Sequence, residues 1–270
     1  MSLHDEYARL TPYELLFAVD TAVDEFISAL DDEFAGRGAD PDSLHAFVTM
    51  GVVTDFIRNV EGEDAPPESI HQYGALAFHA THFHRAGRPV YLLSAHAARY
   101  LVEGVGGSEP IPPAPAGYLQ LPQHLFWLDD GSGTPQSVDG IFWKTTGVAG
   151  RLEALLVTGV RPDRTGLGVV PLPEAPLSDA PSWLELDARG DGADYTNPMP
   201  GADLDALYLF ATSGEVFKLL ARFFAYSSAV PGALVGVDAV RSGSEPDPSG
   251  GAAAGPESSR LDFTRVTLEG

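Results

Sequence analysis

The chain holds 270 residues, and its hydrophobic share of 44% is typical of a globular protein with a buried core. Thirty-eight acidic residues against 16 basic residues give a formal net charge of -22 at pH 7, which repels nucleic-acid backbones and anionic lipid surfaces. There is no cysteine, so disulfides and thiolate chemistry are excluded. No apolar run reaches the ~20 residues of a membrane span, and the first residues lack a signal-peptide pattern. We therefore expect a cytoplasmic protein with neither nucleic acid nor membrane as a partner.

The basic residues are almost all arginine, and Lys144 and Lys218 are the only lysines. Many aspartates with few lysines are typical of a surface that stays hydrated in concentrated salt. The same composition follows from GC-rich codon usage, which also raises the share of Ala, Gly, Pro and Arg. Both explanations stay open, and both indicate a bacterial or archaeal source.

Four apolar-periodic segments fill roughly the first hundred residues, each with a proline near its start and a glycine just beyond its end. The first begins at Thr11-Pro12-Tyr13-Glu14, which predicts a capping box, and continues at helical spacing to Gly36. The other three segments run over 40–62, 67–87 and 89–104. Short connections favour antiparallel neighbours, so the sequence predicts a bundle-like unit of about four helices over 1–104.

A Pro/Gly-rich linker over 105–117 leads into a predicted meander of three short strands. The strands are expected at 118–121 with 125–129, at 138–145 and at 152–160. Neighbouring residues on a strand face opposite sides of the sheet, so Phe142 and Trp143 cannot enter one core. We expect helices to cover both faces; the alternative is an aromatic row exposed as a contact patch.

The last third of the chain predicts strands at 183–186 and 234–240 and one long helix over 203–229. Residues 241–260 are rich in Ser, Gly, Pro and acid, which predicts a flexible tether, and 261–268 have the composition of a terminal strand. Such a strand can pair with its own sheet or with that of a neighbour. The predicted fold class is α+β: the N-terminal helical unit, then an α+β unit over 118–240 with a small, mainly antiparallel sheet and a long C-terminal helix.

Two histidines form a candidate metal site. His79 and His82 share one face of the predicted helix over 67–87, one turn apart, which suits two metal ligands. A third ligand from another helix would be His45, Asp55 or His96. This pattern predicts a divalent transition metal in the helical unit, although histidines at such spacing are also common as core or surface residues.

Other candidates for chemistry are equally ambiguous. Asp129, Asp130 and Asp139 could serve as acids and bases, or could be turn residues only. Lys144 could be a buried nucleophile, but the preferred interpretation is a solvent-exposed lysine on the outer face of its strand. No P-loop, dinucleotide fingerprint, nucleophile elbow or zinc-protease motif occurs.

Without a catalytic motif, the favoured function is a non-enzymatic protein-interaction or regulatory factor with no cofactor, binding a protein partner or a second copy. Its candidate contact residues are Trp127, Trp143, Leu261 and Phe263. The alternatives are a metal-dependent enzyme using the histidine site, and a small-ligand-binding domain with an aromatic pocket between helices and meander.

Overall fold

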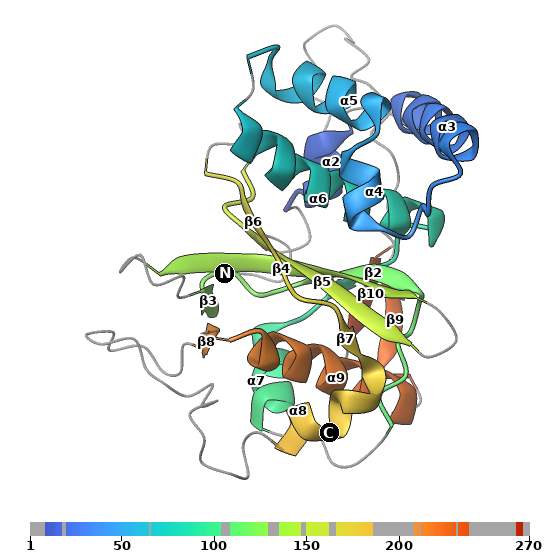
Figure 1. The fold of residues 1–270 in the computed structure, drawn as a ribbon. Coiled ribbons are helices and arrows are strands. Elements are labelled where there is room, and N and C mark those ends of the chain that lie inside the picture. The colour runs from blue at the N-terminus through green and yellow to red at the C-terminus, as the bar shows by residue number, and fades with distance from the viewer. Residues whose placement is uncertain are drawn as a thin grey trace, which may run out of the picture.

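The protein has an α+β fold, in which helices lie on both sides of a mixed sheet that has ten strands among the residues described (Figure 1). The computed structural model describes residues 9–17, 20–64, 66–103, 109–128, 135–146, 150–161, 166–185, 208–210, 212–230, 232–237 and 263–266. Among these residues, no helix has the length and apolar content needed to cross a bilayer.

One helical layer comes from the N-terminal part of the chain. It contains α2 (Pro12–Leu16), α3 (Asp20–Arg37), α4 (Leu44–Val48), α5 (Gly51–Glu61) and α6 (Pro67–Arg85). The predicted capping box is present: Thr11 N donates to Glu14 Oε2 at 2.7 Å. The expected helices over 12–36 and 40–62 are each interrupted, because the backbone turns extended at Phe17 and Met50. Both side chains are buried, so core packing overrides helical spacing there.

The sheet combines antiparallel and parallel pairs. Its strands are β1 (Val90–Leu92), β2 (Ala116–Gln120), β3 (Phe126–Leu128), β4 (Gln136–Thr146), β5 (Arg151–Thr158), β6 (Gly168–Pro171), β7 (Ala175–Pro176), β8 (Tyr208–Phe210), β9 (Leu234–Val237) and β10 (Phe263–Val266). The main order is β6-β5-β4-β2-β1-β10-β9, with β3, β7 and β8 paired beside it. The predicted meander is confirmed, because β2, β4 and β5 pair antiparallel. The sheet is nevertheless larger than expected, and parallel pairs join β1 to β2, β1 to β10 and β3 to β8.

The predicted helix over 89–104 is wrong in its first part. Val90–Leu92 form β1, a buried strand between β2 and β10. The helix there, α7, spans only Ala95–Glu103, and Ser94 Oγ accepts a hydrogen bond from Ala97 N at 3.1 Å near its start. Pro89 therefore precedes a strand, which local punctuation could not distinguish from a helix start.

Two further predictions near the C-terminus need correction. Trp183, expected in a strand, lies in helix α8 (Ala180–Glu185), where its ring stacks on Phe217 at 5.0 Å. Tyr208–Phe210, expected within the long helix, form β8, and α9 (Ser213–Ala229) follows a capping box of Thr212 and Glu215. Residues 186, 203–207, 211, 238–262 and 267–268 of the predicted segments lie outside the described residues.

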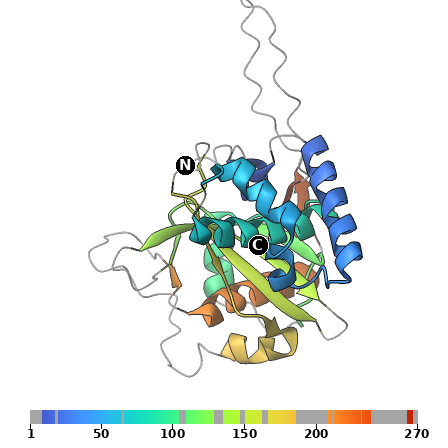
Figure 2. The ribbon, with the colours of Figure 1, turned by 45° about the horizontal axis from the view of Figure 1, so that its top comes forward.

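Helices lie on both sides of the sheet (Figure 1, Figure 2). Two apolar clusters of buried residues fill the space between these helices and the two faces of the sheet. One lies under α2–α6 and includes Phe142; the other lies under α7, α8 and α9 and includes Trp143. Coverage of both faces is therefore confirmed. Each cluster contains residues from both sides of the predicted linker, so the helical and sheet segments share their cores.

Close packing of β2 on β4 predicts the effect of a single methyl group. Gly117 pairs with Trp143, and a Cβ at Gly117 would overlap the indole ring. We expect Gly117→Ala to lower the free energy of unfolding by about 1–3 kcal/mol, measured by urea denaturation. The control is Gly36→Ala on α3, where a Cβ meets nothing within 4 Å and alanine should stabilise the helix by up to ~1 kcal/mol. Equal stability of the two variants would contradict the packing.

Candidate functional site

Lys144 lies near the end of β4 and is 2% exposed. The prediction of a solvent-exposed lysine is therefore wrong. Strand alternation places Lys144 on the same face as Phe142, and that face is covered by α6. The sequence does not reveal this burial, because the covering helix comes from a distant part of the chain.

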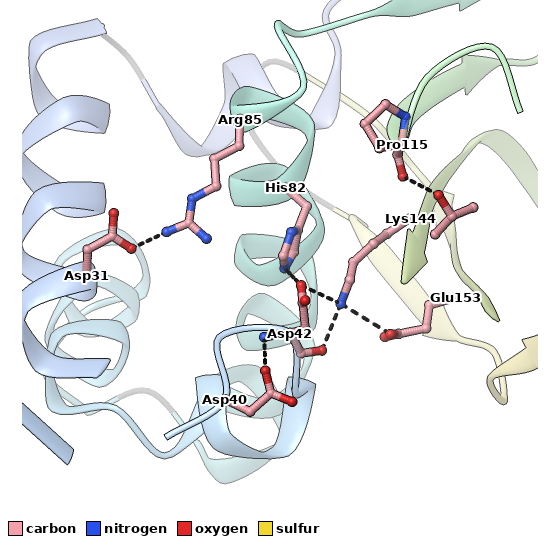
Figure 3. Close-up of polar contacts among 9 residues, drawn as sticks. Asp31, Asp40, Asp42, His82, Arg85, Pro115, Lys144 and Glu153 are labelled. Carbon is pink, nitrogen blue, oxygen red and sulfur yellow. Dashed lines mark hydrogen bonds and ion pairs between the residues drawn. The ribbon is translucent and has the colours of Figure 1, made fainter. Parts of the chain in front are cut away.

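The Lys144 ammonium is enclosed by oxygen atoms and an aromatic ring. Its Nζ donates to Asp42 O at 2.7 Å and to Glu153 Oε1 at 3.2 Å, and it lies 3.6 Å from Asp42 Oδ1 (Figure 3). The ring of Phe78 packs against it, 4.3 Å from the nitrogen to the centroid. A buried ammonium needs such compensation, since desolvation of an unpaired charge is costly.

The two carboxylates reach Lys144 from different elements. Glu153 on β5 is its cross-strand neighbour, and burial raises the pKa of Glu153 although Lys144 acts in the opposite direction. Asp42 lies in the loop before α4, where its backbone N–H donates to Asp40 Oδ1 at 2.9 Å. Lys144 thus connects the sheet to this loop of the helical layer.

His79 and His82 lie beside this cluster on α6. His82 Nε2 is 3.8 Å from Asp42 Oδ1, and the His79 ring stacks on Phe142 with centroids 6.4 Å apart. Burial, followed by the nearby positive charges, lowers the pKa of each imidazole to about 3. Both rings are therefore neutral at pH 7.

The expected third metal ligands do not join His79 and His82. His45 and Asp55 are exposed on α4 and α5, and His96 lies on α7, which packs on the other face of the sheet. Within the described ranges, no three His, Asp or Glu side chains gather as metal ligands. The Lys144 ammonium adds a positive charge next to both imidazoles, which opposes cation binding.

Comparison with known proteins found no matching family model, curated protein or solved structure.

The predicted contact residues have different positions. Trp143 is 1% exposed and packs against Phe223 and Phe224, so it belongs to the core and not to a surface patch. Trp127 is half-buried, and its Nε1 donates to His124 O at 2.9 Å. Phe263 is the first residue of β10, and Leu261 lies outside the described residues.

Of the three acid–base candidates, Asp139 lies within the described residues, and it contacts Arg9. Arg9 Nη1 lies 3.5 Å from Asp139 Oδ1, while Nη2 donates to Leu121 O at 2.6 Å. Asp139 Oδ2 accepts from Val160 N at 2.9 Å, at a point where the β4–β5 register shifts. Burial raises the pKa of Asp139 in spite of these contacts. Both carboxylate oxygens are engaged, which favours a structural role; Asp129 and Asp130 lie outside the described residues.

The position of β10 is a second candidate site, built from backbone groups. β10 pairs parallel with β1 and antiparallel with β9. Among the described pairings, β9 joins the sheet only through β10. We call the space between β1 and β9 the β10 slot. Sequence reasoning predicted the terminal strand but not this internal place in the sheet.

Removal of the Lys144 ammonium should leave the half-buried Glu153 carboxylate without its counter-charge. We expect Lys144→Met to lower the free energy of unfolding by about 3–5 kcal/mol at pH 8. A carboxyl group whose pKa is raised in the folded state destabilises the fold as pH rises through that pKa. The decrease in the free energy of unfolding caused by Lys144→Met should therefore be smaller at pH 5 than at pH 8. Denaturant titration at both pH values measures this.

Two variants control the Lys144 experiment. Lys144→Met combined with Glu153→Gln should regain part of the stability, because the unpaired charge is gone. Arg151→Met on the neighbouring strand β5 breaks the more exposed pair with Glu174 and should cost at most ~1 kcal/mol. A loss at Lys144 no greater than that at Arg151 would refute the role of the buried ammonium.

The lowered pKa values of His79 and His82 predict acid sensitivity. An unfolded histidine titrates near ~6.5, so their contribution is complete above that pH and is lost as pH falls toward about 3. Each histidine adds a slope of up to ~1.4 kcal/mol per pH unit in this window. The test compares unfolding free energies between pH 7.5 and 4.5 for the wild type and for His79→Asn with His82→Gln. Between these pH values the free energy of unfolding of the wild type should fall more than that of the double variant. His45→Gln changes an exposed histidine, so this control should fall as much as the wild type. If the free energy of unfolding depends on pH in the same way in the wild type and the double variant, the lowered pKa values of His79 and His82 are refuted.

Proposed function

We propose that this protein is a non-enzymatic interaction protein that binds a partner strand in the β10 slot. The observation that carries the proposal is the pairing of β10 on both sides, with β1 and with β9. Recognition by strand addition uses main-chain hydrogen bonds, so it requires no conspicuous side-chain motif.

The strands on both sides of the β10 slot pair with β10. On one side, Val90–Leu92 pair with Phe263–Arg265; on the other, Leu234–Val237 pair with all four residues of β10. Removing β10 would leave two rows of N–H and C=O groups without these partners. Unpaired strand edges of this kind are templates for another strand.

The charge distribution supports a protein partner. The chain carries a formal net charge of -22, and both of its lysines, Lys144 and Lys218, are buried. A strongly acidic surface disfavours nucleic acid, which leaves a protein as the favoured class of partner.

The other two functions have less support. The metal-dependent enzyme lacks a third ligand among the described residues. A depression of about 560 Å³ is lined by Asp55, Arg58 and Asn59 on α5 and by Glu63 in the turn after it. It is polar and lies away from the meander, unlike the aromatic pocket that a small-ligand domain would need.

A truncated chain lacking residues 261–270 tests the proposal. We expect it to be less stable than the full chain and to bind a labelled peptide of residues 261–270, as measured by fluorescence anisotropy. The control peptide carries Thr264→Pro, which removes a backbone donor from the middle of β10 and should abolish binding. Equal stability of both chains, together with no peptide binding, would refute the β10 slot as an interaction site.

A further inference from the structure

We infer that the partner is a second copy of this chain, and that two copies exchange their C-terminal strands so that each β10 fills the slot of the other. This inference rests on the proposed function, because it requires the β10 slot to accept a strand from another molecule. It adds the identity of the partner and the symmetry of the complex.

The register of β9 and β10 would allow a very short connection within one molecule. Val237, the last residue of β9, pairs directly with Phe263, the first residue of β10. Two residues can join such a pair as a hairpin. The chain instead places 25 residues, 238–262, between them. The connection is therefore far longer than pairing within one molecule requires.

The connection over 238–262 is also long enough to span the distance to a neighbouring molecule. At about 3.3 Å per residue, 25 residues can extend to ~80 Å. A folded chain of 270 residues has a radius of gyration of about 18 Å and hence a diameter near ~50 Å. The connection is long enough for β10 to reach the slot of an adjacent molecule. By contrast, a two-residue hairpin would hold β10 next to its own β9.

The strand contacts of β10 are the same whether it pairs within its own chain or with a second copy. An exchanged β10 would pair parallel with β1 and antiparallel with β9, as it does within one chain. The balance between them is then set by protein concentration against the effective concentration of the chain's own strand. By the -3/2 power of loop length, 25 residues reduce that effective concentration about 40-fold relative to two.

Reciprocal exchange closes the assembly. Each copy gives one strand and receives one, so no β10 slot remains empty and no further copy can add there. This is the two-fold arrangement expected for exchange of an identical element between protomers.

The experiment compares the full chain with a variant in which residues 238–262 are replaced by Asn-Gly. This replacement joins Val237 to Phe263 by a two-residue hairpin and leaves β9 and β10 intact. Light scattering and sedimentation are measured from about 10 µM to 1 mM. We expect the dimer fraction of the full chain to rise with concentration, while the hairpin variant stays monomeric.

A third variant and a labelled mixture complete the test. Full-length Thr264→Pro disrupts β10 in either arrangement and should not dimerise. The chain has no cysteine, so Ser28→Cys on the exposed side of α3 gives one labelling site for energy transfer between donor and acceptor molecules. Transfer should appear in the full chain and be absent from the hairpin variant.

The outcomes separate the inference from the proposed function. If the peptide of residues 261–270 binds the truncated chain but the full chain stays monomeric at 1 mM, exchange between copies is overturned, because each chain then fills the slot with its own β10. If the hairpin or Thr264→Pro variant dimerises as strongly as the full chain, dimerisation uses another surface and the inference also fails. If the peptide does not bind, the proposed function itself fails.

Discussion

Burial of both faces of β4 is the constraint from which most other features follow. Phe142 packs against Phe83 on α6, with centroids 5.6 Å apart, and Trp143 packs against Phe223 on α9, 5.8 Å apart. The middle of the strand therefore has no solvent-facing side. Close approach to β2 is possible because Gly117 lies opposite the Trp143 ring. Polar side chains on β4 must consequently find their partners inside the protein.

Two ion clusters meet this need in the same way. Lys144 joins β4 to Glu153 and to the Asp42 loop, and Arg9 joins the N-terminal segment to Asp139 and Leu121. Each combines a cation, a carboxylate and a backbone carbonyl from separate parts of the chain. Buried ion pairs often add little net stability, but losing one partner is expensive. The clusters therefore specify which loop and which terminal segment pack on the sheet, and their charges are engaged in that role.

The β10 slot differs because its recognition groups belong to the backbone. β10 adds to β1 and β9 through main-chain hydrogen bonds, so the proposed binding of a partner strand requires no side-chain motif. Two copies that each carry a charge of -22 repel each other in dilute buffer. Salt shortens the range of this repulsion, so strand exchange and a strongly acidic surface are compatible in concentrated salt.

The sequence by itself determined the features that have local causes. The capping box at Thr11, the helix over 67–85, the antiparallel strands of the meander and the need for two covered faces all follow from spacing, punctuation and strand alternation. Only the tertiary structure decided the remainder. Val90–Leu92 become a strand because β2 and β10 pair with them, and Lys144 is buried because α6 covers its face and Asp42 meets its ammonium. Such partners lie far away along the chain, and local residue spacing holds no information about them.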